Sequence, residues 1–438
     1  MSELPGYVGY PWVGDNSLEF YRDPVHFMEK RIQDYSSRIF QARFINRPTV
    51  FVGSAEAVKK LLNEKTQHFD MGYKALWQGL YGENVLFSDG TEAIALRALL
   101  IPLFNREAVS GYQNTVERIC DRTLQSIPAG KPVKVYELLK QMSTEISMGL
   151  FLDIEREADN SLGPHVSQLM TQHWHGIISM PANLKLPTWG GNWESGYSKA
   201  QEAKDELLQI IRDRIGKNKH NNVLGLMKTA GFRSEDEIYW HLLLFVSALV
   251  PKAFSSLFTS FTLQLAGPSK ASMRQKALED ETFLEHILLE VQRLWPPFIG
   301  GRRLVRQEFT LAGYRIPKEH GLMYVTHTAH RDPQIFPEPH SFKPERWSTC
   351  NAGHEGYLCA FGGGPRRCVG TQLVQLVLKH VTKYLLRNFH WEVTQAEIPP
   401  YKWLPVSRPT VEDQVIFTPR DSSGEEVEMG VEVAETSL

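Results

Sequence analysis

The sequence predicts a mainly α-helical protein with a minor β region. Residues 38–53 alternate apolar and polar side chains, which is the period of a half-buried strand pair. From about residue 55 to residue 295, apolar residues recur instead at helical spacing. A glycine-rich loop at residues 361–370 then leads into a further apolar helical run. The fold should therefore be built chiefly from helices.

The other elements follow in chain order. The turn signal at residues 46–48 predicts that the first two strands form a hairpin. A loop rich in Trp and Pro, at residues 174–193, should interrupt the helical stretch. Short strands are expected near residues 303–318 and 322–326. From residue 421 the chain is acidic and serine-rich without periodicity, which predicts a disordered tail.

Composition limits the domain organisation and the class of partner. Of the 438 residues, 42% are hydrophobic, which is enough for a large core. No linker-like shift or internal repeat divides the chain, so we expect one domain at residues 1–420 and a tail at residues 421–438. The net charge of −2 and the lack of a basic run argue against nucleic acid as a partner.

Cysteine usage and apolar runs indicate the compartment. The four cysteines show neither metal-ligand nor disulfide-framework spacing, which favours a reducing environment. The longest apolar run, Leu242 to Val250, is shorter than the about 20 residues that a membrane helix needs. We therefore expect a soluble, cytoplasmic monomer with no transmembrane segment.

The glycine-rich loop ends in a cysteine immediately before a helix. The positive end of a helix and backbone N–H groups freed by glycines lower the pKa of a thiol, so Cys368 is suited to act as an anionic ligand. A thiolate ligand on heme iron favours O–O bond cleavage, and Arg366 can pair with a heme propionate. The alternative is a plain glycine-rich turn that holds a structural cysteine.

The complete pattern F-x-x-G-x-R-x-C-x-G resembles the heme-binding loop of the cytochrome P450 family at every signature position. Residues 290–293 resemble the E-x-x-R helix of that family, and residues 342–347 resemble its P-E-R-F segment. The resemblance implies a cytochrome P450 fold, with heme b buried between a long distal helix and the proximal cysteine loop. It also implies a buried cluster of Glu290, Arg293 and Arg346 behind that loop.

The resemblance also supplies the residues that contact the cofactor. Residues 296–303 are closest to the retinoid-hydroxylating branch and its cyanobacterial relatives, and they provide a second propionate partner in Arg303, with Arg302 as the alternative. The implied set of cofactor-binding residues is Cys368 as the ligand of the iron, together with Phe361, Gly362, Arg366, Gly370, Arg97 and Arg303.

The distal helix departs from the family pattern. Most cytochromes P450 carry A/G-G-x-D/E-T there, and this acid and alcohol deliver protons for O–O cleavage. Here residues 246–256 read V-S-A-L-V-P-K-A-F-S-S, without a carboxylate in any register. Pro251 should disrupt the helix, because it lacks an N–H and clashes with the preceding turn. Lys252 is a candidate for facing the pocket, and Ser255 or Ser256 is a candidate alcohol.

The proximal side also departs from the pattern. The W/H-x-x-x-R helix appears as A-I-A-L-R at residues 93–97, which keeps Arg97 and loses the aromatic or histidine residue. Residues 98–101 are apolar where relatives often carry basic residues, so electrostatic steering of an acidic electron donor should be weak. The protein then needs no electron partner, or it uses a ferredoxin or a flavoprotein reductase.

Both departures favour oxygen chemistry that starts from a peroxide. The leading hypothesis is a heme-thiolate enzyme that rearranges a hydroperoxide or endoperoxide, acts as a peroxygenase, or catalyses another redox-neutral isomerisation or lyase reaction. The alternative is a conventional monooxygenase, dependent on O2 and a reductase, that hydroxylates a terpenoid, retinoid or fatty acid. A third reading, from another class, is a non-catalytic heme-binding sensor.

The substrate pocket is expected to be apolar. By analogy with the family, its lining includes Ala248, Val250, Phe298 and Ile299, which favours a lipophilic small molecule. His173 and His175 flank a tryptophan in the predicted loop, and we interpret them as surface residues rather than metal ligands.

Overall fold

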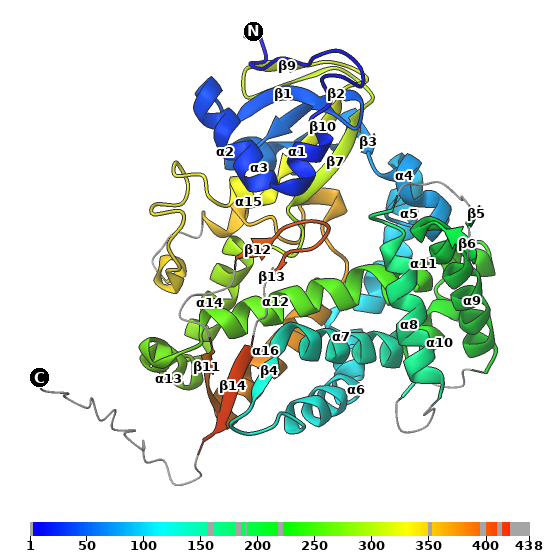
Figure 1. Cartoon of the computed structure of the whole chain (residues 1–438), viewed down its shortest axis with the longest axis vertical. Helices are drawn as coiled ribbons and strands as arrows, with labels where there is room; N and C mark the ends of the chain where they lie inside the picture. Colours follow the sequence, from blue (N-terminus) through cyan, green and yellow to red (C-terminus); the bar gives the residue numbers. More distant parts are fainter. Residues whose placement is uncertain are drawn as a thin grey trace, which may run out of the picture.

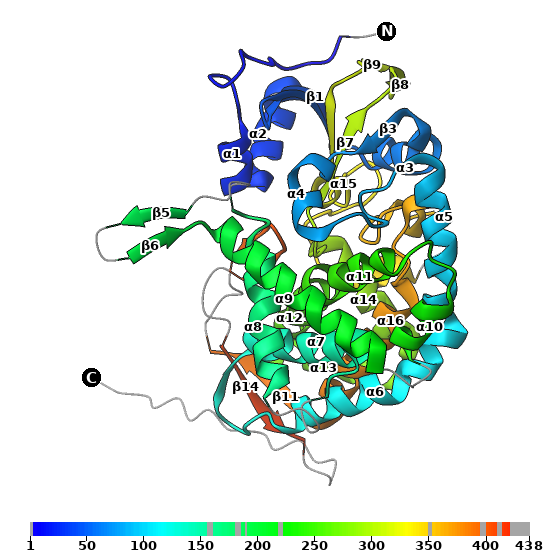
Figure 2. The same cartoon turned by 90° about the vertical axis from the view of Figure 1, so that its right-hand side faces the viewer.

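The computed structural model of the chain describes residues 3–155, 161–179, 185–188, 191–217, 222–348, 353–394, 400–409 and 414–420. Helices make up most of these residues, and a sheet with its covering helices lies at the end of the molecule that holds the N-terminus (Figures 1 and 2). The predicted class, mainly α with a minor β region, is confirmed. The predicted tail at residues 421–438 lies outside the described residues.

The helices follow the predicted helical stretch and continue beyond it. The α-helices are α1 (Ser17–Arg22), α2 (Pro24–Tyr35), α3 (Ala55–Glu64), α4 (Lys74–Tyr81), α5 (Gly90–Leu100), α6 (Arg106–Gln125), α7 (Val135–Leu152), α8 (Leu162–His175), α9 (Gly196–Lys217), α10 (Val223–Thr229), α11 (Glu235–Leu244), α12 (Val250–Gln264), α13 (Ala271–Glu279), α14 (Glu281–Leu294), α15 (Thr326–Ala329) and α16 (Thr371–Asn388). Short 3₁₀ turns are η1 (Thr66–His68), η2 (Ile101–Phe104), η4 (Pro268–Lys270), η5 (Pro344–Trp347), η6 (Glu355–Tyr357) and η7 (Gly364–Arg366).

The largest sheet has the strand order β1-β2-β10-β7-β3. Its strands are β1 (Ile39–Phe44), β2 (Arg47–Val52), β3 (Phe69–Met71), β7 (Gly300–Val305) and β10 (Gly321–Val325). The predicted hairpin is confirmed, since β1 and β2 pair antiparallel with Phe44 opposite Arg47. The strands expected near 303–318 and 322–326 correspond to β7, β8 (Phe309–Leu311), β9 (Tyr314–Ile316) and β10.

The smaller sheets lie elsewhere in the molecule. Strands β4 (Pro132–Lys134), β11 (Phe389–Val393) and β14 (Gln414–Pro419) form a three-stranded sheet, and β12 (Tyr401–Lys402) pairs with β13 (Arg408–Pro409). The predicted loop at residues 174–193 is only partly correct. Helix α8 extends to His175, and β5 (Lys185–Thr188) pairs with β6 (Gly191–Glu194) as a projecting hairpin (Figure 2).

The distal helix is continuous through Pro251. Helix α11 passes into a π turn, η3 (Phe245–Leu249), and α12 follows without a break. Proline in an α-helix clashes with the carbonyl group four residues earlier, and the wider π turn shifts that carbonyl of Ser247. The prediction that Pro251 disrupts the helix is therefore wrong. The helix continues through Pro251, and the preceding turn widens from α to π winding.

Helix α12 crosses the middle of the molecule and lies along α7 (Figure 1). Among the described residues, Glu235–Gln264 is the one helix long and apolar enough to cross a membrane. In its most apolar window, however, 88% of the residues are buried inside the protein, which is the pattern of a core helix. The largest core cluster gathers around it, with Val246, Phe254 and Phe258 among its members.

Candidate functional site

The cysteine loop is a tight backbone structure that favours glycine at two points. The N–H of Cys368 donates to the carbonyl of Phe361 at 2.8 Å, which closes the loop. Gly362 and Gly364 have φ values of +68° and +55°, in the left-handed region. A Cβ on Gly364 would lie 2.2 Å from the carbonyl oxygen of Leu62 on α3. The glycines thus let the loop pack against α3 and present the cysteine.

The side chain of Cys368 combines access to solvent with a dense protein environment. The side chain is accessible to solvent, yet surrounding protein atoms raise the pKa of its thiol through burial. The backbone N–H of Gly370 and the guanidinium groups of Arg97 and Arg367 lower that pKa, and burial outweighs them. The prediction of a net lowered pKa is therefore wrong for the protein without a metal. A coordinating thiol is deprotonated by the metal itself.

Two arginines of β7 have buried nitrogen atoms without a hydrogen-bond partner among the described residues. The Nε atoms of Arg302 and Arg303 are buried and lack a hydrogen-bond partner, although both residues lie on β7 with less than a tenth of their surface exposed. Arg97 donates from Nη2 to the carbonyl of Arg367. Arg302 donates to the carbonyl of Gly72 and faces the ring of Phe44, whereas Arg303 acts electrostatically on Arg366 of the cysteine loop. Arg97 and Arg303, with its orphaned Nε, therefore fit heme b, whose propionates would accept from them while Cys368 would hold the iron.

Arg366 has an internal partner that sequence reasoning missed. Its Nη2 atom lies 2.9 Å from Oδ1 of Asp89, the residue that precedes α5. Burial raises the pKa of the Asp89 carboxyl, while the N–H of Met71 and the Arg366 charge lower it. To bind a heme propionate, the Arg366 guanidinium would therefore have to leave Asp89 or bind both anions at once.

Behind the loop, Glu290 accepts from both predicted arginines. Its Oε1 lies 2.7 Å from Nη2 of Arg293 and 3.0 Å from Nε of Arg346. Trp347 adds an indole N–H to Oε2 at 3.1 Å, a donor that the motif alone did not indicate. Glu290 and Arg293 are fully buried, so these bonds offset a large desolvation cost. Asp280 caps the start of α14 and thereby fixes the helical position of Glu290 and Arg293.

In residues 246–256, the side chains that the structure describes include no carboxylate, and each serine hydroxyl has a hydrogen-bond partner. Ala248 is buried, Val250 is half-buried, and neither can hold a proton. Ser255 is buried and its hydroxyl lies 2.6 Å from the carbonyl of Pro251, so it is committed to its own helix. Lys252 is buried, with 7% of its surface exposed, and burial lowers the pKa of its ammonium group to about 8.

Sequence reasoning also missed a polar network on the π turn. The Nε2–H of His173 donates to the carbonyl of Leu80 at 3.0 Å, which leaves Nδ1 to accept from the Ser247 hydroxyl at 2.8 Å. The prediction that His173 is a surface residue is wrong, because it is fully buried on α8 and burial lowers its pKa to about 4. Its spacing of seven from the buried Val166 was the available signal.

The predicted pocket residues do not all come together. Ala248 belongs to the large core cluster and Phe298 packs against it. Ile299 lies instead among the residues beneath the large sheet, with Met323 and Val325. Phe298 and Ile299 therefore belong to different apolar clusters, as expected of successive residues of an extended chain, and their place in the pocket stays a prediction.

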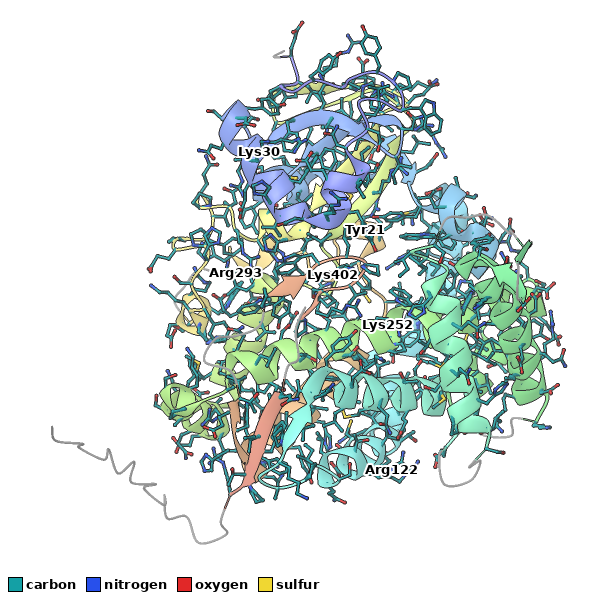
Figure 3. All side chains as sticks on the ribbon, viewed as in Figure 1. Tyr21, Lys30, Arg122, Lys252, Arg293 and Lys402 are labelled. Carbon is teal, nitrogen blue, oxygen red and sulfur yellow. The ribbon has the colours of Figure 1, made fainter. Side chains whose placement is uncertain are left out.

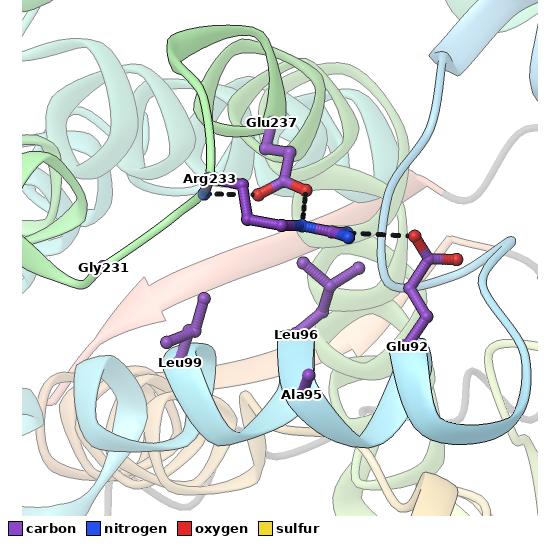
Figure 4. Close-up of a pocket in the computed structure, with 7 residues that line it drawn as sticks. All are labelled: Glu92, Ala95, Leu96, Leu99, Gly231, Arg233 and Glu237. Carbon is purple, nitrogen blue, oxygen red and sulfur yellow. Dashed lines mark hydrogen bonds and ion pairs between the residues drawn. The ribbon is translucent and has the colours of Figure 1, made fainter.

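Two surface hollows lie apart from this region. One, of about 250 Å³, is lined by α5 and the start of α11, and Arg233 spans it between Glu92 and Glu237 (Figure 4). The other, of about 640 Å³, is lined by residues 21–29 and 401–403. Neither is lined by a residue of the cysteine loop or of the π turn. Among the described residues, no group of His, Cys, Asp and Glu could hold a metal ion.

Comparisons with known proteins agree with this geometry. Residues 5–229 and 263–417 match the family model described as Cytochrome P450. The gap in that match contains α11, η3 and most of α12, which is the segment where the distal pattern departs.

Several curated proteins align along most of the chain. A β-amyrin 28-monooxygenase from Kalopanax septemlobus is 24% identical, over 89% of this chain and 86% of its own length. Cytochrome P450 26B1 from Mus musculus is also 24% identical, over 96% of this chain and 88% of its own. Among solved structures, the retinoic acid-bound cyanobacterial CYP120A1 superimposes with a TM-score of 0.84, at 24% identity, over 96% of this chain and all of that one.

Proposed function

The chain belongs to the cytochrome P450 family, and we propose that it cleaves the O–O bond of a lipophilic peroxide substrate without an external reductase. Such a reaction is a redox-neutral rearrangement in which the oxygen atoms come from the substrate. Bound heme supplies the iron centre for O–O cleavage, with Cys368 as its thiolate ligand. The proposal concerns what the rest of this chain contributes.

The observation that carries the proposal is the distal helix. Residues 246–256 contain no carboxylate in any register, and Val250 in this segment is half-buried. The hydroxyl of Ser255 is bonded to the carbonyl of Pro251 at 2.6 Å. Ser247 is bonded to His173. A site without the family's acid–alcohol pair suits a substrate that already contains an O–O bond, because such a substrate needs no proton delivery for the activation of dioxygen.

The surface of α5 supports the same proposal. Ile94 and Ile101 expose 63% and 52% of their surface, next to the helix turn that carries Arg97. Lys379 on α16 is paired with Glu281 and Glu285, so it offers little unpaired charge. An acidic electron donor would meet an apolar face here, and steering by charge would be weak.

A conventional monooxygenase is the second candidate. The named relatives include β-amyrin 28-monooxygenase, and the solved structure at TM-score 0.84 holds retinoic acid. These names favour hydroxylation of a terpenoid or retinoid. In that case the substrate or ordered water would have to supply the proton path that the distal helix lacks.

The two candidates separate under anaerobic conditions. We expect the heme-loaded protein to consume a fatty-acid hydroperoxide without reductant and to form one defined product. The Cys368→His variant, which keeps an iron ligand but loses the thiolate, should lose this activity, and Cys120→Ala on α6 should keep it. A protein that turns over only with O2 and a reductase would contradict the proposal.

A further inference from the structure

Lys252 is a buried charge without a counter-ion. It is 7% exposed, and its Nζ atom makes no hydrogen bond or ion pair with any residue in the described ranges. The ring of Trp174 lies 5.7 Å from Nζ and gives a weak cation–π contact only. Lysines are almost never this buried unless paired, because desolvation of an ammonium group is costly. The position therefore needs an explanation beyond packing.

The surroundings of Lys252 are also cationic. The positive charges of Lys140 on α7 and Arg408 on β13 repel the ammonium group of Lys252. The carboxylate of Glu137 attracts it, but Glu137 already pairs with Lys140 at 2.7 Å. Lys252, Lys140 and Arg408 also lower the pKa of His175 at the end of α8, in addition to the larger effect of burial. Like charges held close together repel, so this arrangement is unfavourable unless an anion joins it.

Four separate elements build the site. Lys252 sits on α12 where it meets α7 and α8 (Figure 3), and Arg408 arrives on the strand after the β12–β13 turn. A bond of 2.6 Å between the hydroxyls of Ser256 and Ser407 ties that turn to α12. The base of the site is buried, whereas Lys140 is half-buried and Arg408 is exposed. We call this cluster of Lys252, Lys140 and Arg408, which reaches solvent on the side of Lys140 and Arg408, the Lys252 recess.

The apolar residues beside the recess indicate the rest of the ligand. Ala248 is buried on the π turn, four residues before Lys252. Trp174 covers the same lysine from α8. An apolar body beside these two side chains and a negative end at Lys252 would fit one molecule. We propose that the Lys252 recess binds the carboxylate of a lipophilic acid, an inference that rests on the proposed function and names its substrate class.

The test uses the heme-loaded protein and three matched probes: dodecanoic acid, its methyl ester and dodecan-1-ol. Binding is followed by the shift of the heme absorption band. The wild type should bind the acid about 10- to 100-fold more tightly than the ester, the size expected of a hydrogen bond to a charged group. Lys252→Met should bring this ratio close to one, while Lys252→Arg should keep most of it.

The control is Lys30→Met, which removes an exposed lysine on α2 far from the recess and should leave the ratio unchanged (Figure 3). Inorganic phosphate should not compete with the acid, and competition would assign the recess to soluble anions instead. Equal affinities for acid and ester, no binding of the acid, or an unchanged ratio in Lys252→Met would overturn the inference. Consumption of the fatty-acid hydroperoxide without reductant is measured on the same preparation, so failure of the acid to bind at Lys252 is distinguished from failure of the proposed function.

Discussion

At the scale of single residues, Lys252 carries a cost that the fold alone does not offset. Burial and the nearby Lys140 and Arg408 lower the pKa of its ammonium group from 10.5 to about 8, against the opposing effect of Glu137. Glu290 shows the opposite case, because Arg293, Arg346 and the Trp347 indole occupy both of its oxygens. One buried charge is satisfied within the chain and the other is left for a ligand.

This difference predicts a gain in stability when Lys252 is replaced. Because the pKa of Lys252 is lower in the folded state, the unfolded state binds more protons. The destabilisation caused by burying the charged lysine is therefore complete below about pH 8 and disappears as the pH rises to 10.5. In the absence of ligand, Lys252→Met should therefore raise the free energy of unfolding at pH 7 by up to about 3 kcal/mol.

Urea unfolding of the heme-loaded protein at a series of pH values measures this effect. The advantage of Lys252→Met should shrink between pH 8 and pH 10.5, as the cited pKa shift requires. Tyr136 and His175 also lie near the recess, but burial raises the pKa of the first and lowers that of the second. A variant that is less stable than the wild type at pH 7 would show that Lys252 is satisfied after all.

At the scale of elements, the distal helix joins two departures from the family pattern. Pro251 removes a backbone N–H, and the π turn Phe245–Leu249 absorbs the change in winding. Ser247 lies on that turn and is bonded to His173 of α8. The polar atoms of this segment are thereby directed to a neighbouring helix, which leaves apolar side chains and Lys252 for a ligand.

Removal of the Ser247 hydroxyl should therefore loosen the contact between the π turn and α8. Ser247→Ala leaves Nδ1 of the fully buried His173 without a donor, which should lower the free energy of unfolding by about 1–3 kcal/mol. Thr259→Val is the matched control on α12, since the buried Thr259 hydroxyl has no hydrogen-bond partner and its loss should be neutral or stabilising. Urea denaturation compares the two, and equal effects would refute the assigned hydrogen bond.

At the scale of the whole molecule, the sequence predicts what local motifs encode. The glycines around Cys368 and the pairing of Glu290 with Arg293 depend on short-range spacing, and the structure brings these residues together as expected. The sequence does not predict the buried environment of Lys252 or the ion-pair partner of Arg366. Their contacting residues, Trp174 and Asp89 respectively, lie far away in the chain. Such contacts arise only when distant helices pack.

The central claim is that oxygen comes from a peroxide substrate rather than from O2, and isotope labelling tests it most directly. The heme-loaded protein is supplied with an unlabelled fatty-acid hydroperoxide, a reductase system and ¹⁸O₂. The ¹⁸O content of the product is then measured by mass spectrometry. The absence of the family's acid–alcohol pair from residues 246–256 predicts a product without ¹⁸O, formed equally well when the reductase is omitted. A product that carries ¹⁸O and requires the reductase would contradict the account and identify a conventional monooxygenase.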